Sequence, residues 1–152
     1  MTRARIPRLG AAVGLLAVLA TGCASETETY CGDLAERRDE LTELAASPDA
    51  DALQETRDVL GELRDSAPAD IEDEWSTLVF AYESLAEAFD DADVAPGEYD
   101  PASPPAEVTD EQARRIEGAA AELRTPRVVQ AADGLEQHAR DVCKVDLGLS
   151  SG

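Results

Sequence analysis

The feature that most constrains this sequence is an apolar stripe between residues 69 and 91. Apolar side chains recur there at alternating steps of four and three, which places them on one side of an α-helix. A stripe sustained over so many turns is typical of a helix packed in a bundle. The residues of the stripe are Ile71, Trp75, Leu78, Tyr82, Leu85 and Phe89.

Shorter stripes predict four more helices, at residues 31–46 and 51–66, from Asp110 to Thr125-Pro126, and from there to near Cys143. Breaker sequences separate them, among them Ser47-Pro48-Asp49. Ala67-Pro68 is expected to begin the third helix, since proline is tolerated in a first turn. Thr109-x-x-Gln112 predicts a capping box.

Between the third and fourth helices, residues 92–108 form a long acidic loop that contains four prolines, Pro96, Pro101, Pro104 and Pro105. No stretch of the sequence alternates as a β-strand does. We therefore predict an all-α protein, a small bundle of four to five helices, with the bundle domain spanning residues 30–147. Residues 148–152 are expected to be a disordered tail.

The N-terminus has the composition of an export signal. Arg3, Arg5 and Arg8 precede the uncharged run Leu9–Ala20, which is too short to span a bilayer. The run ends in Leu19-Ala20-Thr21-Gly22-Cys23, which resembles the lipobox of bacterial lipoproteins.

That resemblance implies that residues 1–22 are a signal peptide and that Cys23 is lipidated and becomes the new N-terminus. The protein would then be exported and anchored to the outer face of the cytoplasmic membrane. Residues 23–29, which are polar and acidic, would serve as anchor and tether. Ordinary cleavage after Ala24 is the alternative.

Two further cysteines, Cys31 and Cys143, stand at the two ends of the predicted bundle. Exported proteins meet an oxidising compartment, so we expect these two to form a disulfide. A redox or metal pair is the alternative, but the sequence holds no CxxC and one histidine. If the first three helices alternate in direction, the last helix must return down the bundle to bring Cys143 to Cys31. The fourth is then expected to lie across or antiparallel to it.

From Cys23 onward the chain carries 33 acidic and 10 basic residues, a net charge of −23. Nucleic-acid binding requires clustered Lys and Arg, so that class is nearly excluded. Adaptation to a salty habitat is one possible explanation of this acidity.

Phe80 lies away from the apolar stripe, on a polar side of the third helix. We expect the loop to cover it through Val94, Tyr99 and Pro104. The alternative is a groove for a ligand or partner between Phe80 and Tyr99, with an apolar floor and an acidic rim.

Several carboxylates near the end of the third helix have no local explanation, because they approach the negative end of the helix dipole. Together with the loop they are candidate ligands for a hard cation or a cationic molecule. A solvated acidic surface is the simpler interpretation. The candidates are Glu87, Asp90, Asp91, Asp93 and Glu98.

No catalytic constellation is evident, since His138 has no nucleophile at a recognisable spacing and is expected to pack on its neighbours. The layout also resembles small uncharacterised helical lipoproteins of actinobacteria, a resemblance that implies no activity. It rests on Tyr30-Cys31-Gly32, on residues 68–75 and on Asp141-Val142-Cys143-Lys144.

We therefore expect a non-enzymatic interaction domain without cofactor or metal, held at the membrane by lipid on Cys23, with an extracytoplasmic protein as its partner. A solute-binding lipoprotein that holds a divalent cation or cationic ligand at the acidic loop is the alternative. A hydrolase that needs nothing but carboxylates is the least favoured.

Overall fold

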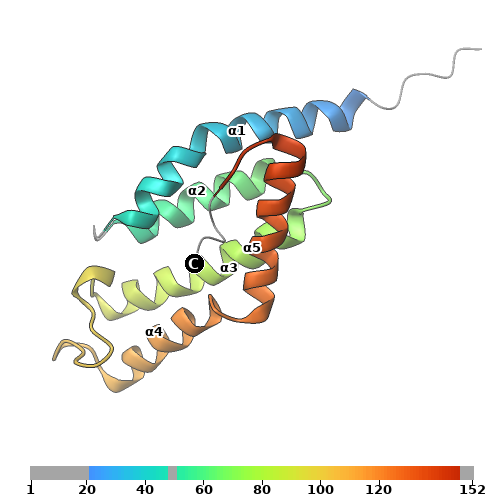
Figure 1. Ribbon diagram of the computed structural model, residues 1–152. Coiled ribbons are helices and arrows are strands. Elements are labelled where there is room, and N and C mark those ends of the chain that lie inside the picture. The colour runs from blue at the N-terminus through green and yellow to red at the C-terminus, as the bar shows by residue number, and fades with distance from the viewer. Residues whose placement is uncertain (1–20, 48–50, 148–152) are drawn as a thin grey trace, which may run out of the picture.

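The computed structural model describes residues 21–47 and 51–147, which form five α-helices and two shorter helical turns (Figure 1). The described residues contain no strand, so the predicted all-α class is confirmed. The helices are α1 (Thr21–Ala46), α2 (Ala52–Ser66), α3 (Glu72–Ala92), α4 (Asp110–Glu122) and α5 (Pro126–His138). A 3-10 turn, η1 (Pro96–Glu98), lies in the α3–α4 loop, and a π-helical turn, η2 (Ala139–Cys143), extends α5.

Helix α1 begins ten residues earlier than the sequence predicted, at Thr21 rather than near Cys31. The polar residues 23–29, expected to be a tether, therefore belong to the helix. A polar composition does not by itself prevent a helix, and this segment contains no proline that would break one. Once the turn at Tyr30 is packed, extending a helix costs little compared with starting one.

Helix α3 begins later than predicted. The Pro68 carbonyl accepts a hydrogen bond from the Ile71 N–H at 3.1 Å, which forms a turn, and the helix starts at Glu72. Proline at position 68 therefore belongs to the connection and not to the first turn of the helix.

The predicted capping box at the start of α4 is confirmed. The Gln112 N–H donates to Thr109 Oγ1 at 3.3 Å, and the Thr109 N–H donates to Gln112 Oε1 at 2.9 Å. The predicted break at Thr125-Pro126 is also present, with Thr125 preceding the first residue of α5.

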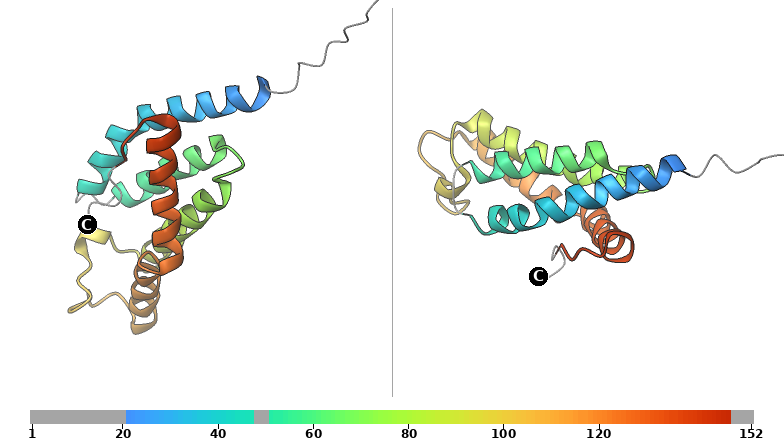
Figure 2. Two further views of the ribbon diagram at one scale, coloured as in Figure 1. Left: turned by 45° about the vertical axis from the view of Figure 1, so that its right-hand side comes forward. Right: turned by 90° about the horizontal axis from the view of Figure 1, so that it is seen from above.

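The first four helices pack in chain order, α1 on α2, α2 on α3 and α3 on α4, and they run back and forth along one direction (Figure 1). Helix α5 lies across them, as the view from above shows (Figure 2). It packs on α3, and η2 reaches α1. The return along the bundle is therefore made by α4, whereas we had predicted it for the last helix. The prediction was wrong because a short connection at Thr125-Pro126 redirects the chain sideways.

Helix α3 is the centre of the core and contributes to two buried clusters. Trp75, Leu78 and Val79 belong to the larger one, which includes residues of α1, α2 and α5. Phe89 and Ala88 belong to the smaller one, with side chains from the loop and α4. The predicted stripe is buried or half-buried throughout. Because α2, α4 and α5 all pack on α3, a second side of it is buried as well, at Val79, Ala81, Ala86 and Ala88.

The predicted disulfide is present, since Cys31 of α1 and Cys143 at the end of η2 are bonded. After Cys143 the chain turns back: the Val145 N–H donates to the Ala139 carbonyl, and Arg38 Nε donates to the Asp146 carbonyl at 2.7 Å. None of the helices in the described part of the chain is long and apolar enough to cross a membrane. Residues 1–20 of the predicted signal peptide, Pro48 and Asp49 of the predicted break, and the predicted tail 148–152 lie outside the described residues.

Candidate interaction surface

The predicted lipid anchor and the disulfide occupy the same helix. Cys23 lies in the first turns of α1, and Cys31 follows eight residues later, about 12 Å along the helix axis. The structure describes the backbone of Cys23 but not its side chain. The helix thus connects the proposed lipid site directly to the disulfide-bonded end of the bundle.

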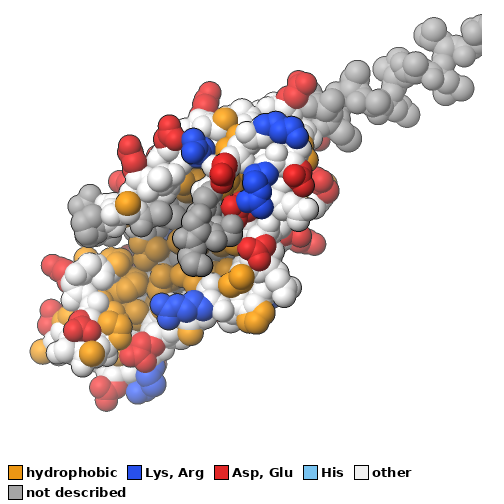
Figure 3. Space-filling model, viewed as in Figure 1, with side chains coloured by type: hydrophobic (Ala, Val, Ile, Leu, Met, Phe, Trp, Pro, Cys, Tyr) orange, Lys and Arg blue, Asp and Glu red, His pale blue; other side chains and the backbone are white. Residues whose placement is uncertain are grey.

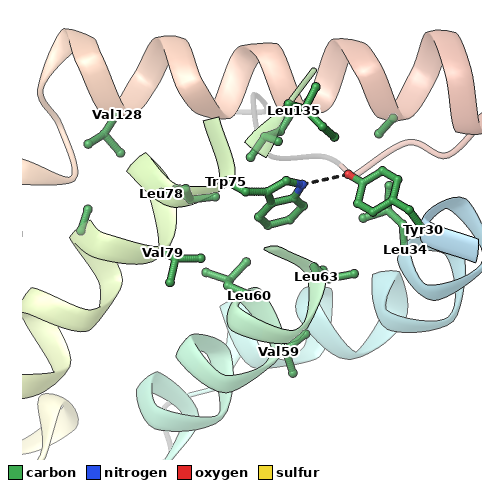
Figure 4. Close-up of a cluster of buried hydrophobic side chains, with 13 residues drawn as sticks. Tyr30, Leu34, Val59, Leu60, Leu63, Trp75, Leu78, Val79, Val128 and Leu135 are labelled. Atoms are coloured by element: carbon green, nitrogen blue, oxygen red, sulfur yellow. Dashed lines mark hydrogen bonds between the residues drawn. The ribbon is translucent and has the colours of Figure 1, made fainter. Parts of the chain in front are cut away.

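Next to the disulfide, Tyr30 and Trp75 form the buried centre of the larger cluster (Figure 4). Trp75 Nε1 donates a hydrogen bond to Tyr30 Oη at 3.0 Å, and their rings meet edge to face. Burial raises the pKa of Tyr30 from 10.0 to about 12, although the hydrogen bond from Trp75 acts in the opposite direction. This end of the molecule is therefore a closed, packed junction.

His138 completes this junction, as its sequence position predicted. Its side chain is 9% exposed, and its ring packs on Tyr30 with centroids 5.8 Å apart. Nε2 lies 4.0 Å from a carboxylate oxygen of Asp70, and Nδ1 is buried without a partner among the described residues. The role that these contacts support for His138 is packing.

Phe80 is 57% exposed, so the prediction that the loop covers it was wrong. Val94 and Tyr99 instead join the smaller cluster, where the Tyr99 ring packs edge to face on Phe89 at 5.8 Å. Phe80 and Phe89 are nine residues apart, which is about half a turn around α3. Tyr99 therefore lies on the other side of this helix from Phe80, and the predicted groove between them does not form.

The acidic candidates do not converge on a common point. Gln54 Nε2 donates to Asp90 Oδ1 at 2.8 Å, and Asp91 is paired with Arg115. Asp93 ends α3 in a left-handed conformation, with φ of 50°. Glu87 and Glu98 are exposed. Within residues 21–47 and 51–147, no three His, Cys, Asp or Glu side chains are grouped to hold a metal ion.

An acidic pocket of about 640 Å³ lies between the end of α1 and the start of α2. The sequence analysis missed it, because it depends on how two helix ends pack around a turn. Carboxylates dominate its lining, which consists of Glu40, Glu43, Leu44, Ser47, Asp51, Ala52 and Glu55.

An apolar surface is visible on the face shown in Figure 3. Hydrophobic side chains gather there in a hollow between α1 and α4, beside α5. No single apolar stripe predicts this hollow, because it lies where several helices meet. The hydrophobic side chains that pack on the two clusters but remain partly exposed include Leu41, Leu53, Tyr82, Leu85 and Leu123.

Most of the positive charge is already engaged within the protein. All ten basic residues from position 23 onward are described, and seven of them lie within salt-bridge distance of a carboxylate. In one of these pairs the carboxylate is buried: exposed Arg140 donates from Nη1 to Glu136 Oε1 at 2.5 Å, and Glu136 is 3% exposed. The large excess of carboxylates therefore remains available to attract cations or cationic molecules.

The fold and this surface together define an all-helical bundle closed at one end by a disulfide and open at an apolar hollow. Comparisons of the chain with protein-family models, curated proteins and solved structures found no match.

Proposed function

We propose that this protein is an exported lipoprotein, anchored by lipid on Cys23 to the outer face of the cytoplasmic membrane, whose helical bundle acts as a non-enzymatic interaction domain. The observation that carries the proposal is the Cys31–Cys143 disulfide, eight residues beyond the lipobox cysteine on the same helix. Structural disulfides persist in exported proteins and are rare in the cytosol. The bridge therefore supports the compartment that the lipobox resemblance implies.

The distribution of buried, paired and exposed side chains supports the interaction role. His138 packs on Tyr30. At the end of α3, Asp90 accepts a hydrogen bond from Gln54, whereas Asp91 is paired with Arg115. The exposed features are an apolar hollow, an acidic pocket and the isolated aromatic Phe80. Exposed apolar surface on a soluble domain commonly marks a contact site for another protein.

The test is mass spectrometry of the full chain expressed in a bacterium that processes lipoproteins. We expect the mature N-terminal peptide to begin at Cys23 with a lipid thioether, and the peptides around Cys31 and Cys143 to be disulfide-linked. Cys23→Ser should abolish the lipid and the membrane association and leave the disulfide intact.

Cys31→Ser is the matched control, because it removes a different cysteine of α1 and should leave the lipid in place. Recovery of the chain in the cytosol with reduced Cys31 and Cys143 would overturn the proposed location. Cleavage after Ala24 without lipid would retain export and overturn the anchor.

A further inference from the structure

Phe80 is the one aromatic residue that takes no part in the core. All six aromatic residues of the sequence lie in the described part of the chain. Five of them belong to or pack on one of the two buried clusters, whereas Phe80 is 57% exposed. A phenyl ring left in water contributes little to folding, and aromatic side chains are enriched where proteins bind one another. Phe80 is therefore the centre of a candidate contact surface.

The side chains beside Phe80 on α3 are short. Ser76 and Ser84 lie four residues before and after it, and Thr77 lies three residues before it. These spacings make all three its neighbours on the helix surface. None of the three is buried. Short neighbours leave the phenyl ring accessible to a partner that lies along this side of the helix.

Exposed carboxylates border the ring at both ends of this surface. Asp73 and Glu87 lie seven residues before and after Phe80, on the same side of α3 and about 10 Å away in each direction. Both are exposed, and neither has a hydrogen-bond or salt-bridge partner among the described residues. Glu83, one turn after the ring, lies 3.8 Å from Arg64 of α2. Since α3 itself contains no basic residue, the charge along this side of the helix is negative.

The charges at this surface favour a cationic occupant. A guanidinium group pairs with a carboxylate through two parallel hydrogen bonds and also stacks on an aromatic face, so arginine suits both parts of the surface. A second copy of the chain that met the same surface would bring Asp73 and Glu87 against like charges, which opposes self-association.

We propose that the side of α3 centred on Phe80, with Asp73 and Glu87 at its two ends, is a docking surface for an arginine-bearing helix of a partner protein. An apolar side chain of that helix packs on Phe80, and arginines seven residues before and after it pair with the two carboxylates. A helix laid along α3 repeats its side chains at the same seven-residue interval. The carboxylates are 14 residues apart, about 21 Å along α3, which sets the length of the contact. The inference rests on the proposed interaction role, and it does not depend on the lipid.

The test uses the full chain in nanodiscs of phosphatidylcholine, with empty nanodiscs as reference and at low ionic strength, where charge pairs are least screened. The probe is a fluorescent, alanine-rich helical peptide with two arginines at the spacing of the two carboxylates and leucines between them on the same side. The control peptide has the same composition, with both arginines moved to the side opposite the leucines. We expect the first peptide to bind at least about fivefold more tightly than the control.

Phe80→Ala should weaken binding of the first peptide about tenfold or more, because it removes the apolar contact at the centre of the surface. Val129→Ala is the matched control, since it shortens another exposed apolar side chain, 46% exposed on α5, and it should leave binding nearly unchanged. Both positions are exposed, so both variants should keep the fold, and circular dichroism verifies this.

Glu87→Gln tests the charge. It should weaken binding of the first peptide about two- to fivefold, the range measured for exposed ion pairs. Glu98→Gln makes the same charge change at an exposed position of the α3–α4 loop, and it should leave binding nearly unchanged.

Equal binding of the two peptides would show attraction by charge without register and would overturn the docking surface. Equal losses in a variant and its control, or no binding of either peptide, would overturn it as well. A dimer in sedimentation that Phe80→Ala abolishes would assign the surface to a second copy instead. The anchor is judged separately: a lipidated chain that binds neither peptide retains the anchor and loses the surface, whereas an unlipidated chain that binds the first peptide retains the surface and loses the anchor.

Discussion

Trp75 Nε1 donates a hydrogen bond to Tyr30 Oη at 3.0 Å, and the two side chains are almost completely shielded from solvent. The bond joins α1 to α3 across 45 residues, directly beside the disulfide that joins α1 to the end of η2. Tyr30 thus lies where the first, third and last helical segments meet. The four predictions that follow all concern this junction.

Tyr30→Phe should destabilise the fold by about 1–3 kcal/mol, because it leaves the buried indole N–H of Trp75 without its acceptor. Urea unfolding followed by tryptophan fluorescence measures the change. Tyr99→Phe is the matched control. Tyr99 is half-buried and its hydroxyl donates to the Ala113 carbonyl at 3.5 Å, so Tyr99→Phe should destabilise the fold by less than about 0.5 kcal/mol. Equal effects of the two variants would contradict a special role of the Tyr30–Trp75 bond.

Alkaline pH should destabilise the protein through Tyr30. The pKa of this phenol is about 12 in the folded protein and near 10.0 in the unfolded chain, mainly because burial disfavours the phenolate. The unfolded state therefore releases the proton first, and the free energy of unfolding falls as the pH rises from about 10 to 12. Below pH 10 both states hold the proton, and Tyr30 adds no pH dependence.

Urea titrations at several alkaline pH values measure this slope. Burial also raises the pKa of Tyr82, which contributes in the same direction. Because Tyr82 is present in both proteins, a shallower slope in Tyr30→Phe isolates the contribution of Tyr30. Identical slopes would mean that Tyr30 ionises in the folded state as it does in the unfolded chain.

Cys143→Ser should lower the free energy of unfolding by several kcal/mol. The bridge spans 112 residues, and the chain-entropy estimate for so long a loop is about 4–5 kcal/mol. Guanidinium unfolding of the oxidised protein measures the loss. Cys31→Ser should give the same loss, and a reducing agent should affect the unaltered protein but neither variant. A variant as stable as the oxidised protein would show that the bridge does not restrict the unfolded chain.

His138→Phe should leave stability unchanged within about 1 kcal/mol or raise it. In the described structure Nδ1 of His138 is buried without a partner, so an apolar ring removes a desolvated polar atom and keeps the contact with Tyr30. Urea unfolding measures the effect, and His138→Ala, which also removes the ring contact, is the comparison. A large loss in His138→Phe alone would show that a polar contact of His138, such as the one with Asp70, is important.

Local signals in the sequence predicted local structure well. The Thr109–Gln112 capping box and the stop before Pro126 depend on groups a few residues apart, and both are present. The stripe of α3 was found for the same reason, since its spacing reflects the helical period. The site was predicted less well: Tyr99 packs on Phe89, and Phe80 remains exposed. Which side of α3 the loop covers depends on contacts between distant residues, and spacing along one helix contains no such information.

By itself, the sequence determined the helical class, the approximate helix ranges and the Cys31–Cys143 bridge, because periodicity, breaker residues and cysteine chemistry act locally or through one covalent bond. The tertiary structure decided the crossing of α5 and the apolar hollow between α1 and α4. These features follow from the way in which whole helical faces pack on one another. Several arrangements satisfy the same apolar stripes, and the total packing of the side chains selects among them.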